Sequence, residues 1–287
     1  MFAKKSYYFT TVLLLFCVSN LLKAQEVKCR VLNQVIHADS SFYDIEKVTE
    51  NQIWICGERG KILVLDTLGN LIFSTQICVT EDFLKIHRYK DRILVASSEA
   101  NIYEFDLKLN FIEKHSYPQL KNKCIYDLLT LDNDDLLICG GHHNIAKAQK
   151  AMPNGYIAII KSDWSSCNFV WKSFRKFVWS VATFDHQILA TTYNGLASKV
   201  IYSKSNARKW RKKLLIKGLI HEINALDNLV IYAGSKNIAY QKQGLIGADS
   251  QSNRSSLVTD TGCIWSFIVD NDHVLAVNNS GELIRYD

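Results

Sequence analysis

A recurring pair of neighbouring residues brings together side chains that could bind a ligand or transfer a proton. Each pair has an aromatic or imidazole residue followed by a polar one, as in Tyr43-Asp44, Tyr126-Asp127, Trp179-Ser180, His221-Glu222 and Trp265-Ser266. Aromatic faces beside hydrogen-bonding groups suit sugars or peptides. An imidazole or a carboxylate can also act as an acid or a base near neutral pH.

The candidates for proton transfer are His221, Glu222 and Asp127. No nucleophile elbow, glycine-rich phosphate loop or Cys-x-x-Cys motif accompanies them, so the sequence indicates no reaction class. His142 and His143 are adjacent. On a strand their side chains would point to opposite faces, which disfavours a shared metal. We therefore expect neither a metal nor another cofactor.

The elements that must position these residues recur with a regular period. Six equivalent first-strand positions lie 41, 42, 53, 42 and 44 residues apart, at Tyr43, Leu84, Tyr126, Trp179, His221 and Trp265. The starts of the following strands repeat nearly the same intervals. This period is typical of a four-stranded propeller blade. The sequence predicts an all-β, six-bladed β-propeller with antiparallel four-stranded blades that start near residues 42, 83, 124, 177, 219 and 263.

Third strands are expected at residues 62–66, 102–106, 156–160, 196–201, 238–242 and 283–287. The chain then ends, which leaves the sixth blade without a fourth strand. Residues 27–36 have strand-like apolar character and precede the first blade. We expect this segment to become the outer strand of the last blade and to close the ring, leaving no open edge between first and last blades.

Two stretches resemble known propeller repeats. Residues 52–62, Gln-Ile-Trp-Ile-Cys-Gly-Glu-Arg-Gly-Lys-Ile, resemble the Trp-Ile-Gly-Thr-type phrase of regulator propellers. Residues 273–286, which begin His-Val-Leu-Ala-Val-Asn, resemble an NHL-type repeat. The resemblance covers the blades and no site. It implies a generic six-bladed ring and carries over no catalytic residues.

In a propeller, the loops that enter the innermost strands and those that join second to third strands surround one mouth of the central channel. The predicted ligand-binding set is therefore Tyr43, Asp44, Lys85, Tyr126, Trp179, Trp265, Arg59, His142 and His143. A purely structural alternative is that one residue of each pair packs between blades while the other caps a turn. The single long insertion, residues 141–154, would overhang the mouth as a lid or would be a tolerated surface excursion.

The first 24 residues resemble an export signal, with Lys4 and Lys5 before an apolar stretch too short to span a bilayer. Its removal would lower the formal net charge from +6 to +3, because it contains three lysines and no acid. We expect one domain over residues 25–287, secreted or periplasmic, without a transmembrane segment. The mild positive charge does not indicate nucleic acid.

Cys56, Cys139, Cys124 and Cys263 occupy repeated strand positions, which favours core packing over disulfides. Cys29, Cys78 and Cys167 remain as bridge candidates. The basic run at residues 208–213 falls on an expected outermost strand. There it would guard the edge against strand pairing, or would contact an anionic envelope surface.

Two functions remain open at this point. The first is an exported, non-catalytic and monomeric propeller that binds a polymer or protein partner, such as a carbohydrate, through its mouth. The alternative is a small propeller enzyme, a lyase or hydrolase acting on a sugar or peptide, with His221, Asp127 or Glu222 as acid or base.

Overall fold

The computed structural model describes residues 30–31, 40–142, 154–173, 176–193, 198–204, 210–216, 218–226, 229–236, 243–249, 254–259, 262–270 and 273–286. These residues form six four-stranded antiparallel sheets. The first contains β2 (Phe42–Thr49), β3 (Gln52–Gly57), β4 (Lys61–Leu65) and β5 (Leu71–Gln76). The second contains β6 (Phe83–Tyr89), β7 (Arg92–Ser97), β8 (Asn101–Asp106) and β9 (Phe111–Ser116). The third contains β10 (Lys123–Thr130), β11 (Leu136–His142), β12 (Gly155–Ile160) and β13 (Cys167–Ser173).

The remaining sheets repeat this arrangement. The fourth contains β14 (Phe177–Phe184), β15 (Gln187–Tyr193), β16 (Ser198–Lys204) and β17 (Arg211–Ile216). The fifth contains β18 (Leu219–Leu226), β19 (Leu229–Ser235), β20 (Gly244–Asp249) and β21 (Arg254–Thr259). The sixth contains β22 (Ile264–Asp270), β23 (His273–Asn278), β24 (Leu283–Tyr286) and β1 (Arg30–Val31). Two 3-10 turns, η1 (Glu58–Gly60) and η2 (Pro118–Leu120), complete the described elements.

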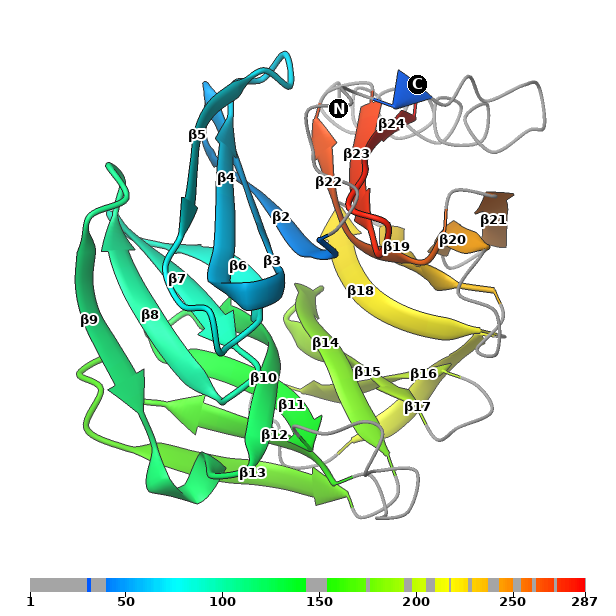
Figure 1. Ribbon diagram of the computed structural model, residues 1–287. Helices are drawn as coiled ribbons and strands as arrows, with labels where there is room; N and C mark the ends of the chain where they lie inside the picture. Colours follow the sequence, from blue (N-terminus) through cyan, green and yellow to red (C-terminus); the bar gives the residue numbers. More distant parts are fainter. Residues whose placement is uncertain are drawn as a thin grey trace, which may run out of the picture.

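The sheets are arranged around a common axis with their first strands innermost (Figure 1). Each of these strands packs against the first strand of the next sheet, and β22 packs against β2. The predicted all-β propeller is confirmed. Of the segment expected to complete the last blade, Arg30 pairs with Arg285 and Val31 with Ile284. The rest of that segment lies outside the described residues.

The third strand of the fifth sheet is β20, later in the sequence than the predicted 238–242. It contains Gly244 and Gly247, and because glycine is uncommon inside strands the sequence did not indicate a strand here. At Gly247 a side chain would collide with the Tyr232 ring, whose atoms lie 2.2 Å from the position of an added Cβ. Tyr232 is itself buried, so glycine lets this strand pack closely on its neighbour.

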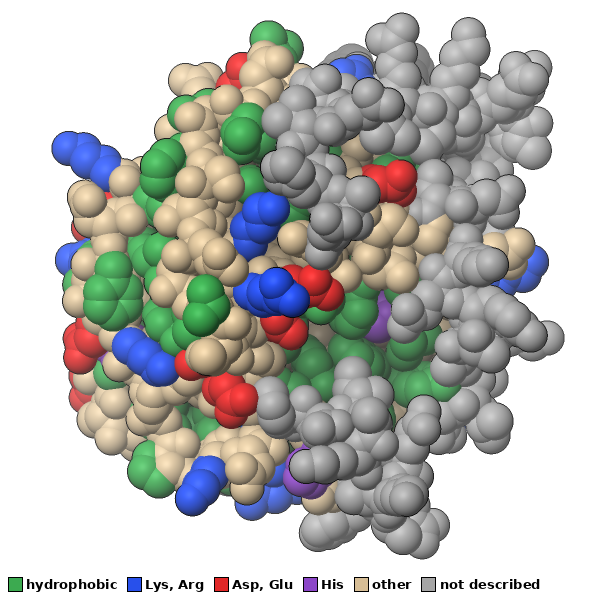
Figure 2. Space-filling model, in the orientation of Figure 1, with side chains coloured by type: hydrophobic (Ala, Val, Ile, Leu, Met, Phe, Trp, Pro, Cys, Tyr) green, Lys and Arg blue, Asp and Glu red, His purple; other side chains and the backbone are tan. Residues whose placement is uncertain are grey.

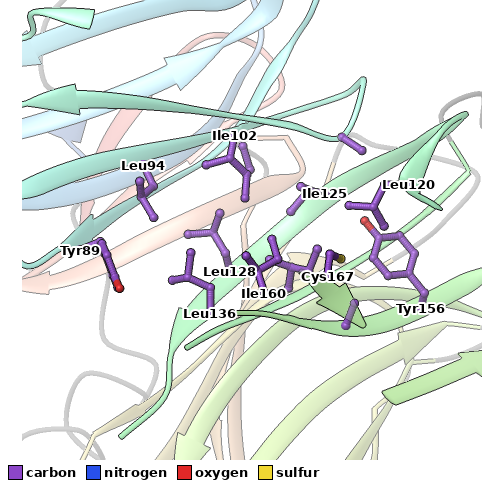
Figure 3. Close-up of a cluster of buried hydrophobic side chains, with 14 residues drawn as sticks. Tyr89, Leu94, Ile102, Leu120, Ile125, Leu128, Leu136, Tyr156, Ile160 and Cys167 are labelled. Carbon is purple, nitrogen blue, oxygen red and sulfur yellow. The ribbon is translucent and has the colours of Figure 1, made fainter. Parts of the chain in front are cut away.

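Apolar side chains fill the spaces between neighbouring sheets. One such cluster joins Tyr89, Leu94 and Ile102 of the second sheet to Leu136 and Tyr156 of the third (Figure 3). Burial of this kind supplies most of the driving force for folding.

The cysteines assigned to the core, Cys56, Cys124, Cys139 and Cys263, are buried as predicted. Cys78 and Cys167 are free thiols, and Cys29 lies outside the described residues. Within the described ranges no helix is both long and apolar enough to cross a membrane.

Candidate functional site at the channel mouth

The recurring residue pair coincides with a β-bulge in the first strand of every sheet. The register with the second strand shifts between Phe42 and Asp44, Phe83 and Lys85, Ile125 and Asp127, Val178 and Val181, Ile220 and Glu222, and Ile264 and Ser266. A bulge inserts an extra residue and interrupts the strict alternation of side chains between faces. The side chains of two consecutive residues can therefore both face the channel, the first at its mouth and the second inside it.

The first members form a continuous group of rings that we call the mouth cluster: Tyr43, Tyr126, Trp179, His221 and Trp265. The Trp265 ring lies 5.1 Å from Tyr43, 3.9 Å from His221 and 5.9 Å from Trp179, centroid to centroid. Trp179 also contacts His221 at 4.8 Å and stacks on Tyr126 at 4.3 Å. Five rings, each from a different sheet, thus form one continuous aromatic cluster.

Figure 2 shows hydrophobic surface in the central hollow of the propeller face, bordered on one side by acidic and basic side chains. The space that the mouth cluster encloses with Leu84 and Glu222 is only about 20 Å³. That volume accommodates roughly one water molecule. A larger ligand would lie over the rings, and its hydroxyl groups would reach the buried ring nitrogens only after a ring side chain shifts.

Three polar atoms of the mouth cluster are buried without a hydrogen-bond partner among the described residues. They are the indole Nε1 atoms of Trp179 and Trp265 and the Nδ1 atom of His221. Trp179 and His221 are each only 5% exposed. Buried polar groups are ordinarily paired, because leaving one unpaired costs about 1–3 kcal/mol. Another unpaired indole, Trp54, lies in an apolar core, so the mouth is distinguished by three such atoms on rings that contact one another.

Burial lowers the pKa of His221 to about 3, so its imidazole is neutral at physiological pH. The ring is surrounded by the two tryptophans instead of by a carboxylate that would orient it. His221 can therefore offer a neutral nitrogen to a ligand, but little of it would be protonated near pH 7.

The second members of the pairs lie inside the channel and form what we call the channel ring: Asp44, Lys85, Asp127, Ser180, Glu222 and Ser266. All six are buried. The Lys85 ammonium is 2.9 Å from Glu222 Oε1 and 3.3 Å from an oxygen of both Asp44 and Asp127. One cation therefore joins carboxylates from three other sheets.

The channel ring also binds backbone groups of adjacent sheets. Asp44 accepts the Ile86 N–H at 2.7 Å, and Asp127 accepts the Val181 N–H at 2.8 Å. The Ser180 hydroxyl donates to Asp127 at 2.7 Å and accepts an N–H from the fifth sheet at 3.1 Å. These bonds connect neighbouring sheets at the bulges, where the ladder within each sheet is interrupted.

Burial raises the pKa of Asp44 despite the nearby Lys85, and burial raises the pKa of Glu222 well above its usual range. Burial alone would lower the pKa of Lys85, but Asp127, Asp44 and Glu222 raise it well above 10.5. Lys85 thus stays charged, whereas Asp44 and Glu222 favour their protonated forms.

The other predicted residues lie apart from these two groups. Arg59 is an exposed residue of η1 whose backbone N–H donates to Asp82 at 2.9 Å. His142 ends β11, and its carbonyl accepts the Tyr126 hydroxyl at 3.4 Å. His143 and most of the 141–154 insertion lie outside the described residues.

Sequence reasoning missed Glu46 and His87, which follow Asp44 and Lys85 by two positions on the same strands. The period of two along a strand could have identified them. Burial raises the pKa of Glu46 to about 7, and burial together with Lys85 lowers the pKa of His87 to about 4. His87 Nε2 lies 2.7 Å from the Thr130 hydroxyl.

The chain resembles solved propellers in structure. A proposed gluconolactonase aligns with a TM-score of 0.70 at 8% identity, covering 93% of this chain and 94% of that one. A streptogramin B lyase aligns at 0.61 and 13%, covering 90% and 97%. The WD40 propeller domain of Doa1 aligns at 0.57 and 9%, covering 91% and 97%. At these identities the similarity shows the fold alone. No protein-family profile and no curated protein sequence matches the chain.

Proposed function

We propose that this chain is an exported, non-catalytic six-bladed propeller, closed by its N-terminal strand, that binds a neutral carbohydrate chain on the mouth cluster. The observation that carries the proposal is that three unpaired polar atoms belong to rings in contact within the mouth cluster. A sugar hydroxyl can accept an indole N–H and donate to a neutral imidazole nitrogen. Apolar sugar faces can rest on the surrounding rings.

The state of the acidic residues favours binding over catalysis. Asp127 and Glu222 both engage Lys85, and Asp127 also holds groups of the fourth sheet. His221 has its pKa lowered to about 3 by burial. A general acid or base works best with a pKa near the operating pH. His221 is therefore poorly suited to proton transfer near pH 7, and Glu222, whose pKa is raised by burial, is held by its ion pair with Lys85.

A binding panel tests this proposal directly. Residues 25–287 would be titrated by calorimetry with maltohexaose, cellohexaose, xylohexaose and chitohexaose, and the products chromatographed after prolonged incubation. We expect at least one saturable interaction and no cleavage. Binding that survives replacement of both Trp179 and Trp265 by Phe would place the site elsewhere.

The enzyme alternative makes the opposite prediction in the same experiment. Shortened or unsaturated products that are lost in a His221→Ala variant of unchanged melting temperature would overturn the non-catalytic assignment. Binding of a peptide or protein from the envelope, with no binding to any of the four oligosaccharides, would overturn the carbohydrate assignment.

A further inference from the structure

A second cavity lies at the end of the channel opposite the mouth. It has a volume of about 230 Å³ and is lined by Glu46, Lys47, Asn224, Ala225, Ile231, Ile268 and Val269. Glu46, Asn224 and Ile268 each follow a member of the channel ring by two residues. Residues two apart on a strand share a face about 7 Å apart, so this cavity begins one layer below the channel ring.

The charges around this cavity are unbalanced. Asp44 and Asp127 lie close enough to raise the pKa of Glu46, and Lys85 acts in the other direction. However, Lys85 is already shared among three carboxylates. Glu46 accepts the backbone N–H of Arg88, a neutral partner. Among the described residues no cation forms an ion pair with Glu46.

The other titratable groups near the cavity are Lys47 and His87. Lys47, which also lines it, pairs with Glu50 at 3.3 Å. His87, the equivalent residue of the second sheet, is neutral because burial and Lys85 lower its pKa to about 4. The sheets on the other side contribute Asn224, Ile231 and Ile268, which carry no charge.

We propose that this far-end cavity binds a small organic cation, with an ammonium group beside Glu46 and a short aliphatic body against Ile231, Ile268 and Val269. An ammonium supplies the charge that the carboxylates lack, and the apolar wall favours an alkylated amine over an inorganic ion. The site is separate from the mouth cluster and does not depend on the carbohydrate proposal.

Calorimetry with n-butylammonium chloride at pH 8 tests the site, with 1-butanol and sodium butyrate as matched probes. We expect butylammonium to bind at least tenfold more tightly than either. Glu46→Gln should weaken butylammonium at least tenfold, whereas Glu113→Gln, which removes an exposed carboxylate from the outer strand β9, should change its affinity less than twofold. At pH 6, binding should release a proton, detected as a heat that depends on the buffer.

A second variant tests the cavity without altering its charge. Ala225→Leu should fill part of the space and weaken butylammonium at least fivefold, with the melting temperature recorded to show that the protein is folded. Equal affinity for 1-butanol, unchanged binding in both Glu46→Gln and Ala225→Leu, or no binding at 10 mM butylammonium would each overturn the proposal. The double Trp179→Phe, Trp265→Phe variant should bind butylammonium normally, which separates this site from the mouth.

Discussion

The mouth cluster and the channel ring occupy consecutive positions on the first strands of the sheets, five strands for the cluster and six for the ring, yet their polar atoms differ in their hydrogen bonding. In the channel ring, Asp44, Lys85, Asp127 and Glu222 all have partners that belong to other sheets, and the exception is Ser266, whose hydroxyl is buried without a hydrogen bond among the described residues. In the mouth cluster, two indole N–H groups and one imidazole nitrogen have none among the described residues. Paired polar groups stabilise the fold, whereas an unpaired polar group gains a hydrogen bond when a ligand reaches it.

The largest effect should follow removal of the cation from the channel ring. Lys85→Met leaves three buried carboxylates without their shared partner, and breaking a buried ion pair on one side typically costs about 3–5 kcal/mol. We expect a loss of that order in urea unfolding. Lys90→Met, which breaks an exposed pair with Asp134, should have a much smaller effect. If both changes lowered the free energy of unfolding equally, Lys85 would have no special role in stabilising the channel ring.

The next effect concerns pH and Glu46. Burial raises its pKa from 4.5 to about 7, so the folded state retains a proton that the unfolded state loses. The resulting stability is fully present below pH 4.5 and is lost as the pH rises through 7. The free energy of unfolding of Glu46→Gln relative to wild type should therefore improve by about 3 kcal/mol between pH 4.5 and 8.

Urea unfolding of both proteins across that range measures this difference. Neutral His87 and His221 destabilise the fold on acidification, because the unfolded imidazoles gain protons first. Their contributions are common to both proteins and cancel in the comparison. A difference that stays flat with pH would show that Glu46 titrates normally.

A smaller effect isolates the bonds between sheets. Ser180→Ala removes a donor to Asp127 and an acceptor for the Ile223 N–H. Leaving buried groups unpaired should cost about 1–3 kcal/mol in the free energy of unfolding. The matched change Ser74→Ala on the exposed outer strand β5 should cost less than about 0.5 kcal/mol. A Ser180→Ala protein as stable as Ser74→Ala would contradict the role of these bonds.

The propeller could be predicted from the sequence because each repeat is recognisable within a short stretch of residues. The first-strand marker at Tyr43 and its five equivalents recurs every 41 to 44 residues, with one longer interval of 53, and every marker falls on a bulge. The third strand of the fifth sheet was misplaced because its glycine is explained only by the Tyr232 ring of the neighbouring strand. Local patterns do not report such contacts.

The site was harder to predict for a related reason. The pairs contain every ring of the mouth cluster and every member of the channel ring except Lys85, but the sharing of Lys85 among Asp44, Asp127 and Glu222 depends on sheets that are distant in sequence. The contrast between paired and unpaired atoms likewise exists only once the strands are placed around the axis. Glu46 belongs to no motif, and its position two residues after Asp44 was its one signal in the sequence; its raised pKa depends on its buried environment.

The most direct test of the central claim removes the unpaired N–H groups while keeping the aromatic rings. In calorimetry with the oligosaccharide bound by wild type, the Trp179→Phe, Trp265→Phe variant should bind about tenfold or more weakly, since each lost hydrogen bond contributes about 1 kcal/mol. Trp54→Phe removes an unpaired indole from the core and should leave affinity unchanged. Unaltered binding by the double variant, or an equal loss in Trp54→Phe, would contradict the account.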